Sequence, residues 1–307
     1  MRIPSLFLFI LILNACSSEQ NTEGLAIERT IEIEHVLQDM NKQEFNIGTN
    51  YYNDLRSEIA TSKGSNNRQK RTKLSVLFEK MYRINLETEA FINYLDYLKK
   101  EILQKSGEDV NAENNKIIIE QMDVTKRCKP AFLDLRKVKD KSNKSAVRDL
   151  FLGSDNLNLS KKGLELWDKI QSFRKRIVNE TGTLEDTLFV SSYSVNVQSI
   201  NEYKDQEDLD EKVDDMISRT NGNLREQKQV LIDIYKDLTF PEYIEFNSVK
   251  HHWVDKQFRD ANVIEAISVI TGLQNKALRA RSLALASIKS KVNICSYGFD
   301  SIMPMTS

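Results

Sequence analysis

The chain has 307 residues, and its 44 Lys and Arg against 45 Asp and Glu give a formal net charge of -1 at pH 7. This balance provides no positive field for a polyanion, so we expect no nucleic-acid partner. Only 4 prolines and 10 glycines interrupt a chain in which 29% of the residues are charged, a composition typical of long solvent-facing helices and unlike a turn-rich β-sandwich. The predicted fold class is mainly α.

The N-terminal residues have the pattern of a secretion signal followed by a lipid-attachment site. One cation precedes an apolar core, LFLFILIL, and Ala15 stands directly before Cys16. This core is much shorter than the roughly 20 residues that span a bilayer as a helix. The tripeptide LNA before the cysteine resembles a bacterial lipobox, so residues 1–15 are predicted to be a cleaved signal and Cys16 to carry lipid. An ordinary cleaved signal and a short uncleaved anchor are the alternatives.

A polar tether and a first long helix are expected next. Residues 16–24 are small and polar and read as a tether between the lipid and the folded part. A helix is predicted over residues 25–60, with an interruption at NIGTN, from apolar residues at helical spacing: Ile27, Ile31, Val36, Leu37 and Met40. The stretch SKGSNNRQKR at 62–71 is typical of a turn between helices.

The clearest periodicity runs from Leu74 to Ile102, where apolar residues recur every three or four positions. It predicts a core-facing helix that ends near residue 106. Residues 110–155 are less regular and indicate an excursion with short helical or strand pieces. A further helix is predicted from Ser160, placed as an N-cap, to a C-terminal cap at Gly182.

The second half of the chain predicts more helices. LFVSSYSVNV at 188–197 is β-branched and aromatic and indicates a short strand. DQEDLDEKVDDMI lacks the register of a calcium-binding EF-hand loop, so it is interpreted as the first turn of a helix. Another helix is expected around LREQKQVLIDIYKDL, before Pro241, and a last long helix from about Asp260 to Val292. An antiparallel helical bundle domain is thus predicted over residues 25–292, followed by an extended tail over 293–307.

The chain carries no recognised catalytic or metal-binding motif. HExxH, GxSxG, Walker and GxGxxG patterns are absent from the sequence. His251 and His252 are adjacent and would point about 100° apart on a helix, unlike ligands of one metal ion. We therefore expect a non-enzymatic protein with no metal and no cofactor. Cys128 and Cys295 belong to a chain expected to be exported, where they form either a disulfide or two separate thiols.

Three collinear stretches resemble a known family. They are INLETEAFINYLDYLKKEI, GSDNLNLSKKGLELWDKI and HHWVDKQFRDANVIEAISVITGLQNKALRARSLALASI. In this order they resemble the N-terminal helical domain of the gliding motility protein GldM family, and the resemblance spans most of residues 70–299. In the strongest element Trp253 and Phe258 precede a helix that carries Leu273, Gln274 and Asn275. These five residues are interpreted either as partner contacts or as core and capping residues.

The resemblance implies a mechanical role. GldM family members are inner-membrane subunits of the type IX secretion and gliding machinery of Bacteroidota, and their periplasmic parts form dimers. This chain departs from them at its lipoprotein-like N-terminus, at Asn262, where the family has proline, and near Met305, where the family's β domains would begin. The hypothesis is a membrane-anchored lipoprotein on the periplasmic side or in the outer membrane. It would act as a scaffold or docking module for gliding or secretion components and form a homodimer.

Two other functions stay open at this stage. The first is a small-molecule-binding lipoprotein with a pocket between helices lined by Trp167, Tyr94 or Tyr97. The second is an enzyme with an unfamiliar site, which a cleft holding convergent polar groups would favour.

Overall fold

The computed structural model describes residues 21–62, 68–110, 117–120, 128–153, 158–182, 197–219, 225–246 and 248–297. These residues form a mainly α fold, which confirms the predicted class. The predicted signal segment, Cys16 and all but the last residue of the strand expected at 188–197 lie outside the described residues. Residues 21–24 of the predicted tether already belong to the first helix.

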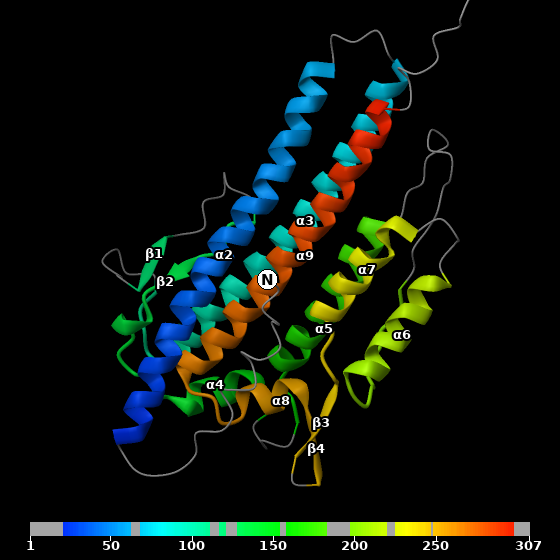
Figure 1. Cartoon of the computed structure of the whole chain (residues 1–307). Coiled ribbons are helices and arrows are strands. Elements are labelled where there is room, and N and C mark those ends of the chain that lie inside the picture. Colours follow the sequence, from blue (N-terminus) through cyan, green and yellow to red (C-terminus); the bar gives the residue numbers. More distant parts are fainter. Residues whose placement is uncertain are drawn as a thin grey trace, which may run out of the picture.

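Three long helices form the centre of the fold: α2 (Asn21–Ser62), α3 (Arg68–Lys105) and α9 (Val263–Tyr297). They lie side by side, with α2 and α9 running in one direction and α3 running against them (Figure 1). Each helix turns a stripe of apolar side chains to its neighbours; on α3, Leu77, Met81 and Ile84 are fully buried. Burial of each such side chain contributes about 1.5–3 kcal/mol, which holds the three helices together.

Shorter elements lie on either side of this centre and at its lower end (Figure 1). The helices are α4 (Lys144–Phe151), α5 (Lys161–Gly182), α6 (Gln206–Ser218), α7 (Arg225–Asp237) and α8 (Trp253–Phe258). Strand β1 (Ile118–Glu120) pairs antiparallel with β2 (Phe132–Leu133), which a 3₁₀ turn, η2 (Leu135–Lys137), follows. Strands β3 (Tyr243–Phe246) and β4 (Val249–His252) form a hairpin. Helix α5 packs on α3, α7 on α5, and α6 on α7.

Side-chain caps explain where several helices begin. Asn143 accepts a hydrogen bond from the Ala146 N–H at the start of α4, and Asp205 caps α6, so the acidic stretch at 205–217 is a helix start, as predicted. At the start of α9, Glu265 N–H donates to Asn262 Oδ1 at 3.0 Å, and Asn262 N–H donates to Glu265 Oε2 at 2.9 Å. This reciprocal capping box lets Asn262 begin a helix without proline.

The predicted core face of α2 is wrong in its central part. Val36 and Met40 are 53% and 36% exposed, whereas Glu34, Gln38 and Asn41 are buried. The polar residues continue the spacing of Ile27 and Ile31 along the helix, so α2 turns a partly polar stripe toward α3 and α9.

The interruption predicted at NIGTN does not occur, because α2 is continuous from Asn21 to Ser62. A Cβ atom at Gly48 would lie 2.7 Å from a guanidinium nitrogen of Arg281. The glycine therefore makes room for a side chain of α9 and does not break the helix.

The end of α9 also differs from the prediction. The helix continues to Tyr297, so residues 293–297 are helical and not part of an extended tail. The first glycine after Gly272 is Gly298, and no proline intervenes, so nothing local ends the helix earlier. The hairpin β3–β4 was not predicted, because each strand is only four residues long and half of their residues are polar or charged, so no apolar run marks them.

Candidate functional site

An open groove between α3 and α5, here the α3–α5 groove, is the first candidate site. It has a volume of about 620 Å³. Its floor is apolar: the rings of Phe91 and Phe173 stack with their centroids 4.5 Å apart, and the Leu164 side chain is 52% exposed beside them. Its rim is charged and carries both signs, from Glu87, Lys161, Glu165, Asp168, Lys169 and Arg176. An apolar centre with a polar rim is the arrangement that is common in protein–protein interfaces.

Local packing fixes the two walls of this groove. Arg176 Nη1 lies 3.1 Å from Glu87 Oε2 and links α5 to α3 across the groove, although its side chain is 62% exposed, so the pair adds little stability. At the start of α5, Ser160 Oγ accepts a hydrogen bond from Gly163 N–H and donates to the Leu150 carbonyl. A Cβ atom at Gly163 would lie 2.3 Å from the Phe151 carbonyl oxygen. The first turn of α5 is therefore held tightly against the end of α4.

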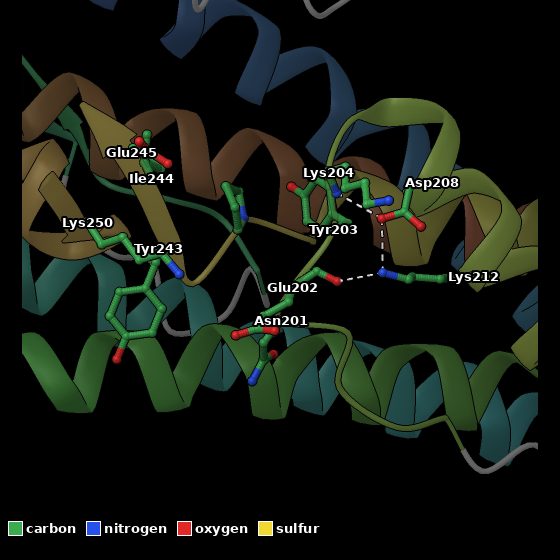
Figure 2. A pocket seen from close by; sticks show the side chains of 11 residues that line it. Asn201, Glu202, Tyr203, Lys204, Asp208, Lys212, Tyr243, Ile244, Glu245 and Lys250 are labelled. Atoms are coloured by element: carbon green, nitrogen blue, oxygen red, sulfur yellow. Dashed lines mark hydrogen bonds and ion pairs between the residues drawn. The ribbon is translucent and has the colours of Figure 1, made fainter. Parts of the chain in front are cut away.

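A second groove, the hairpin groove, lies between β3–β4 and the segment that leads into α6 (Figure 2). Its volume is about 750 Å³. Lys212 Nζ donates to Asp208 Oδ2 and to the Glu202 carbonyl, both at 2.9 Å, and the Lys204 N–H donates to the same carboxylate oxygen at 2.8 Å. Burial raises the pKa of Tyr203 to about 12, so its phenol is neutral. The polar groups on the α6 side are thus largely engaged with one another.

A third group of polar residues is buried between the central helices and is called here the buried polar cluster. Its members are Glu34 and Gln38 on α2, Asp96 and Lys99 on α3, and Thr271 and Gln274 on α9. Thr271 Oγ1 donates to Glu34 Oε1 at 2.6 Å, and Gln274 Nε2 donates to Asp96 Oδ1 at 2.7 Å. The cluster therefore joins α9 to both of the other long helices by hydrogen bonds.

The same cluster holds the β1–β2 segment against the bundle. Gln38 Nε2 donates to the Leu133 carbonyl at 2.9 Å, and its Oε1 accepts from the Leu133 N–H at 3.3 Å. The Ala131 N–H donates to Asp96 Oδ2 at 2.9 Å. Two buried side chains thus hold the backbone on either side of Phe132 against the long helices.

Burial favours the neutral form of each titratable side chain in the cluster. It raises the pKa of the Glu34 and Asp96 carboxyls and lowers the pKa of the Lys99 ammonium, while the opposite charges of the three groups counteract this effect. Lys99 Nζ and Glu34 Oε2 have no hydrogen-bond partner among the described residues. Neither groove is lined by a residue of the cluster.

Further along the bundle, Arg281 occupies a second buried polar contact. Its Nε donates to Asn85 Oδ1 at 2.6 Å, and its Nη1 donates to the Phe45 carbonyl at 3.3 Å. Burial lowers the pKa of this guanidinium below its ordinary value. Arg281 therefore ties α9 to α3 and α2 at a level different from that of Glu34.

The residues singled out by the resemblance lie inside the chain. Trp253, Phe258, Leu273 and Gln274 are at most 4% exposed, and Asn275 is half-buried. The Phe258 ring stacks on Phe151 at 4.0 Å. The structure thus places these four buried side chains in the core and in the polar cluster, away from the surface that a partner could contact.

The pocket expected at Trp167, Tyr94 or Tyr97 is not formed by either groove. Trp167 is 7% exposed and packs edge-on against His252, with ring centroids 4.9 Å apart. Tyr97 is 51% exposed, and its hydroxyl donates to Glu101 Oε1 at 2.8 Å. These aromatic residues serve packing and surface contacts within the chain.

Cys128 is a thiol in the structure and not half of a disulfide. Its Sγ lies 3.2 Å from the Asn85 carbonyl oxygen, on the part of α3 that Arg281 contacts. Cys295 lies fourteen residues beyond Arg281 on α9, about 21 Å along the helix axis. A disulfide requires Cα atoms within about 7 Å, so the predicted alternative of two separate thiols is the one consistent with the fold.

Comparison with known proteins adds no assignment: no family model and no curated protein matches the chain. Within the described residues no helix is long and apolar enough to cross a membrane. In the same part of the chain no group of three His, Cys, Asp or Glu side chains is placed to hold a metal ion.

Sequence reasoning missed the buried polar cluster. A signal was present, because Ile27, Ile31, Glu34, Gln38 and Asn41 follow one another at steps of three and four. Polar residues that continue an apolar stripe indicate a buried polar contact. The partners on α3 and α9 are far away in sequence, so the contact itself could not be read from the chain.

Proposed function

We propose that the chain is a membrane-tethered, non-enzymatic docking lipoprotein that binds another protein in the α3–α5 groove. The observation that supports it most is the make-up of this groove, in which an exposed leucine and two stacked phenylalanines lie between rims of mixed charge. An amphipathic helix fits such a surface, with its apolar face on the floor and its polar flanks against the rim. The lipid on Cys16 attaches the chain to the periplasmic side of a membrane or to the outer membrane.

The related machinery is proposed from the sequence resemblance. Glu87 to Phe91, on one wall of the groove, belong to the first stretch that resembles the GldM family, and Lys161 to Lys169, on the other wall, belong to the second. The third stretch supports the second from behind, since the ring centroids of Trp253 and Trp167 are 6.2 Å apart. The first two stretches therefore line one surface, and the third packs behind it, which favours a partner from the gliding or type IX secretion machinery.

The experiment is affinity purification of the tagged full chain from a gliding member of the Bacteroidota. The expected result is recovery of a gliding or secretion component with the wild-type chain. Leu164→Arg, which places a charge on the groove floor, should reduce that recovery at least tenfold. Ile47→Arg is the matched control, because Ile47 is 42% exposed and lies on α2, away from the groove.

Two results would count against this function. One is recovery of no secretion or gliding component by the wild-type chain under mild detergent conditions. The other is equal recovery by the Leu164→Arg and Ile47→Arg variants, which would show that the partner binds elsewhere. Circular dichroism and thermal unfolding of both variants establish that each remains folded.

A small-molecule-binding lipoprotein is the second candidate function, and the hairpin groove favours it. Its volume of about 750 Å³ is within the range of ligand pockets. Tyr243 and Lys250 lie at one side of this groove and Lys212 at the other (Figure 2). A thermal-shift screen of small anionic and aromatic compounds tests this function, and a hit abolished by Tyr243→Ala would support it.

A further inference from the structure

We propose that one end of the bundle, here the anchor end, rests on an anionic lipid surface and fixes the orientation of the molecule on the membrane. The anchor end consists of the first turn of α2, the basic loop 136–144 and the tip of the β3–β4 hairpin. The inference rests on the proposed lipid attachment at Cys16. It goes further by naming the surface of the folded part that contacts the membrane.

The chain length before α2 keeps the anchor end close to the membrane. Cys16 and Asn21 are five residues apart, and a fully extended chain covers at most about 18 Å over that length. A lipid on Cys16 therefore confines the start of α2 to a thin layer above the bilayer. The start of α2 and the hairpin lie at the same end of the bundle (Figure 1).

Contacts between the elements connect the three parts of the anchor end. Lys144 Nζ, at the start of α4, lies 4.0 Å from Glu23 Oε1 in the first turns of α2. The other end of α4 packs on α8 through the stacked rings of Phe151 and Phe258. Helix α8 begins at Trp253, directly after β4, so the hairpin is carried on the same rigid assembly.

The basic loop supplies the electrostatic attraction. The sequence RKVKDKSNK at 136–144 holds five cations and one acid, and Arg136, Lys137, Lys139 and Lys144 are exposed. The acid, Asp140, accepts a hydrogen bond from Asn143 at 2.9 Å. Two of the exposed cations have acidic partners outside the loop: Lys137 Nζ lies 3.1 Å from Asp134 Oδ2, and Lys144 Nζ lies 4.0 Å from Glu23 Oε1. Each cation near an anionic membrane strengthens binding about fivefold.

The hairpin tip supplies the apolar contact. Phe246 and Val249 form the last pair of the hairpin and are 51% and 53% exposed. Lys256 Nζ lies 3.8 Å from the centre of the Phe246 ring and adds a cation beside the apolar tip. Apolar side chains next to cations at the end of a projecting element fit the boundary between lipid headgroups and acyl chains.

A fixed orientation has a consequence for docking. Helix α2 has 42 residues, so its far end stands about 60 Å from its start. With the anchor end on the membrane, the long helices and the α3–α5 groove extend away from the lipid. The groove is then presented to partners instead of swivelling freely on the acyl chains.

The test uses the full chain, processed in a bacterial host and reconstituted into vesicles of phosphatidylcholine with about 30% phosphatidylglycerol. A photo-crosslinking amino acid, p-benzoylphenylalanine, is placed at position 246 and, as a matched control, at position 47. Ile47 is comparably exposed but lies 26 residues beyond Asn21, about 39 Å along α2. The expected result is a lipid adduct at position 246 and none at position 47.

Charge reversal tests the electrostatic part. Arg136→Glu with Lys139→Glu should reduce the lipid adduct at position 246 at least fivefold, and so should vesicles of phosphatidylcholine alone. The control pair, Arg56→Glu with Arg71→Glu, changes the same charge at the far end of α2 and the start of α3, where both residues are exposed. It should leave the adduct unchanged.

The outcomes separate this inference from the proposed function. A chain that does not remain on the vesicles overturns the lipid attachment and this inference together. A chain that remains attached while position 246 forms no lipid adduct, or forms an adduct with a second copy of the protein, overturns this inference alone.

Discussion

Replacing Glu34 with Gln tests which member of the buried polar cluster is uncharged. Both oxygens of Asp96 accept N–H donors, from Ala131 and Gln274, which favours the carboxylate form. Glu34 uses only Oε1, and its Oε2 has no partner among the described residues. With Lys99 as the cation of the cluster, the group is electrically neutral only when Glu34 holds a proton. We therefore expect Glu34 to be protonated near neutral pH.

The expected effect depends on pH, and its sign follows from proton linkage. Burial raises the pKa of Glu34 above its ordinary value of 4.5. Above pH 4.5 the unfolded chain releases this proton while the folded chain retains it, so stability falls by about 1.4 kcal/mol per pH unit until the folded pKa is reached. Gln has no proton to lose and keeps the oxygen that accepts from Thr271 and Gln38. The unfolding free energy of the Glu34→Gln variant should therefore rise relative to that of the wild type by up to about 1.4 kcal/mol for each pH unit above 4.5, until the folded pKa of Glu34 is reached.

The assay is urea unfolding followed by far-UV circular dichroism, from about pH 5 to about pH 8, for both proteins. Asp96→Asn is the comparison variant: its amide would turn one N–H group toward an existing donor, at an expected cost of about 1–3 kcal/mol. A loss of about 3 kcal/mol or more for Glu34→Gln at pH 7 would refute the reasoning. That result would mean that Glu34 is ionised and forms the buried ion pair with Lys99.

Three further substitutions, the first with a control at Gly24, test the packing and electrostatics. Gly163→Ala should lower the unfolding free energy by about 1–3 kcal/mol, because the added carbon would lie 2.3 Å from the Phe151 carbonyl oxygen. The control Gly24→Ala has nothing within 4 Å of the added carbon and should raise the unfolding free energy slightly. Equal effects of the two substitutions in urea unfolding would contradict this expectation. Phe258→Ala should cost about 3–5 kcal/mol, and a loss under about 1 kcal/mol would show that the stacked pair is not core. Burial lowers the pKa of Lys291 from 10.5 to about 7, so below pH 7 the folded chain buries a charged ammonium. Between about pH 7 and pH 10.5 only the unfolded chain holds this proton, so the unfolding free energy should rise with pH over that range. Lys291→Met should therefore stabilise the chain at pH 6 by about 1–4 kcal/mol, with a benefit that disappears by about pH 10 in thermal unfolding.

The helices that sequence reasoning predicted best are those whose apolar residues keep one period over several turns. The stripe from Leu74 to Ile102 lies within α3, and the helix expected from Ser160 to Gly182 is α5, which begins one residue later. In these helices local capping and the apolar face indicate the same boundaries. Agreement between local and tertiary preferences is what makes an element readable from sequence alone.

The prediction failed where a distant residue decides a local choice. Gly48 looks like a helix breaker, but in the fold it accommodates the guanidinium of Arg281, more than two hundred residues away in sequence. Val36 and Met40 were expected in the core because they are apolar, yet they are exposed. The buried face of α2 is set by polar partners on α3 and α9, which the sequence of α2 does not reveal.

Only part of the candidate site could be predicted from the sequence, for the same reason. The three stretches that carry the family resemblance could be found in the sequence, but the meeting of the first two at the α3–α5 groove depends on how α5 packs on α3. Their most recognisable residues, Trp253 and Phe258, are buried. The exposed Leu164, which we expect to contact a partner, had no signal that distinguished it from other apolar residues of its helix.

The polar contacts inside the bundle give the long helices a defined register. Apolar stripes on α2, α3 and α9 bury similar area when one helix slides by a turn past another, so they specify register weakly. The hydrogen bonds of Thr271 to Glu34 and of Arg281 to Asn85 lie at two different heights along the bundle. A slip of one helix by one turn would leave the buried groups of both bonds without partners. Such a loss costs about 1–3 kcal/mol for each unsatisfied group. The register in turn fixes where the groove and the anchor end lie relative to each other. The docking function that we propose, with lipid holding the chain at one end, requires that rigidity, because acyl chains define a protein's position but not its orientation.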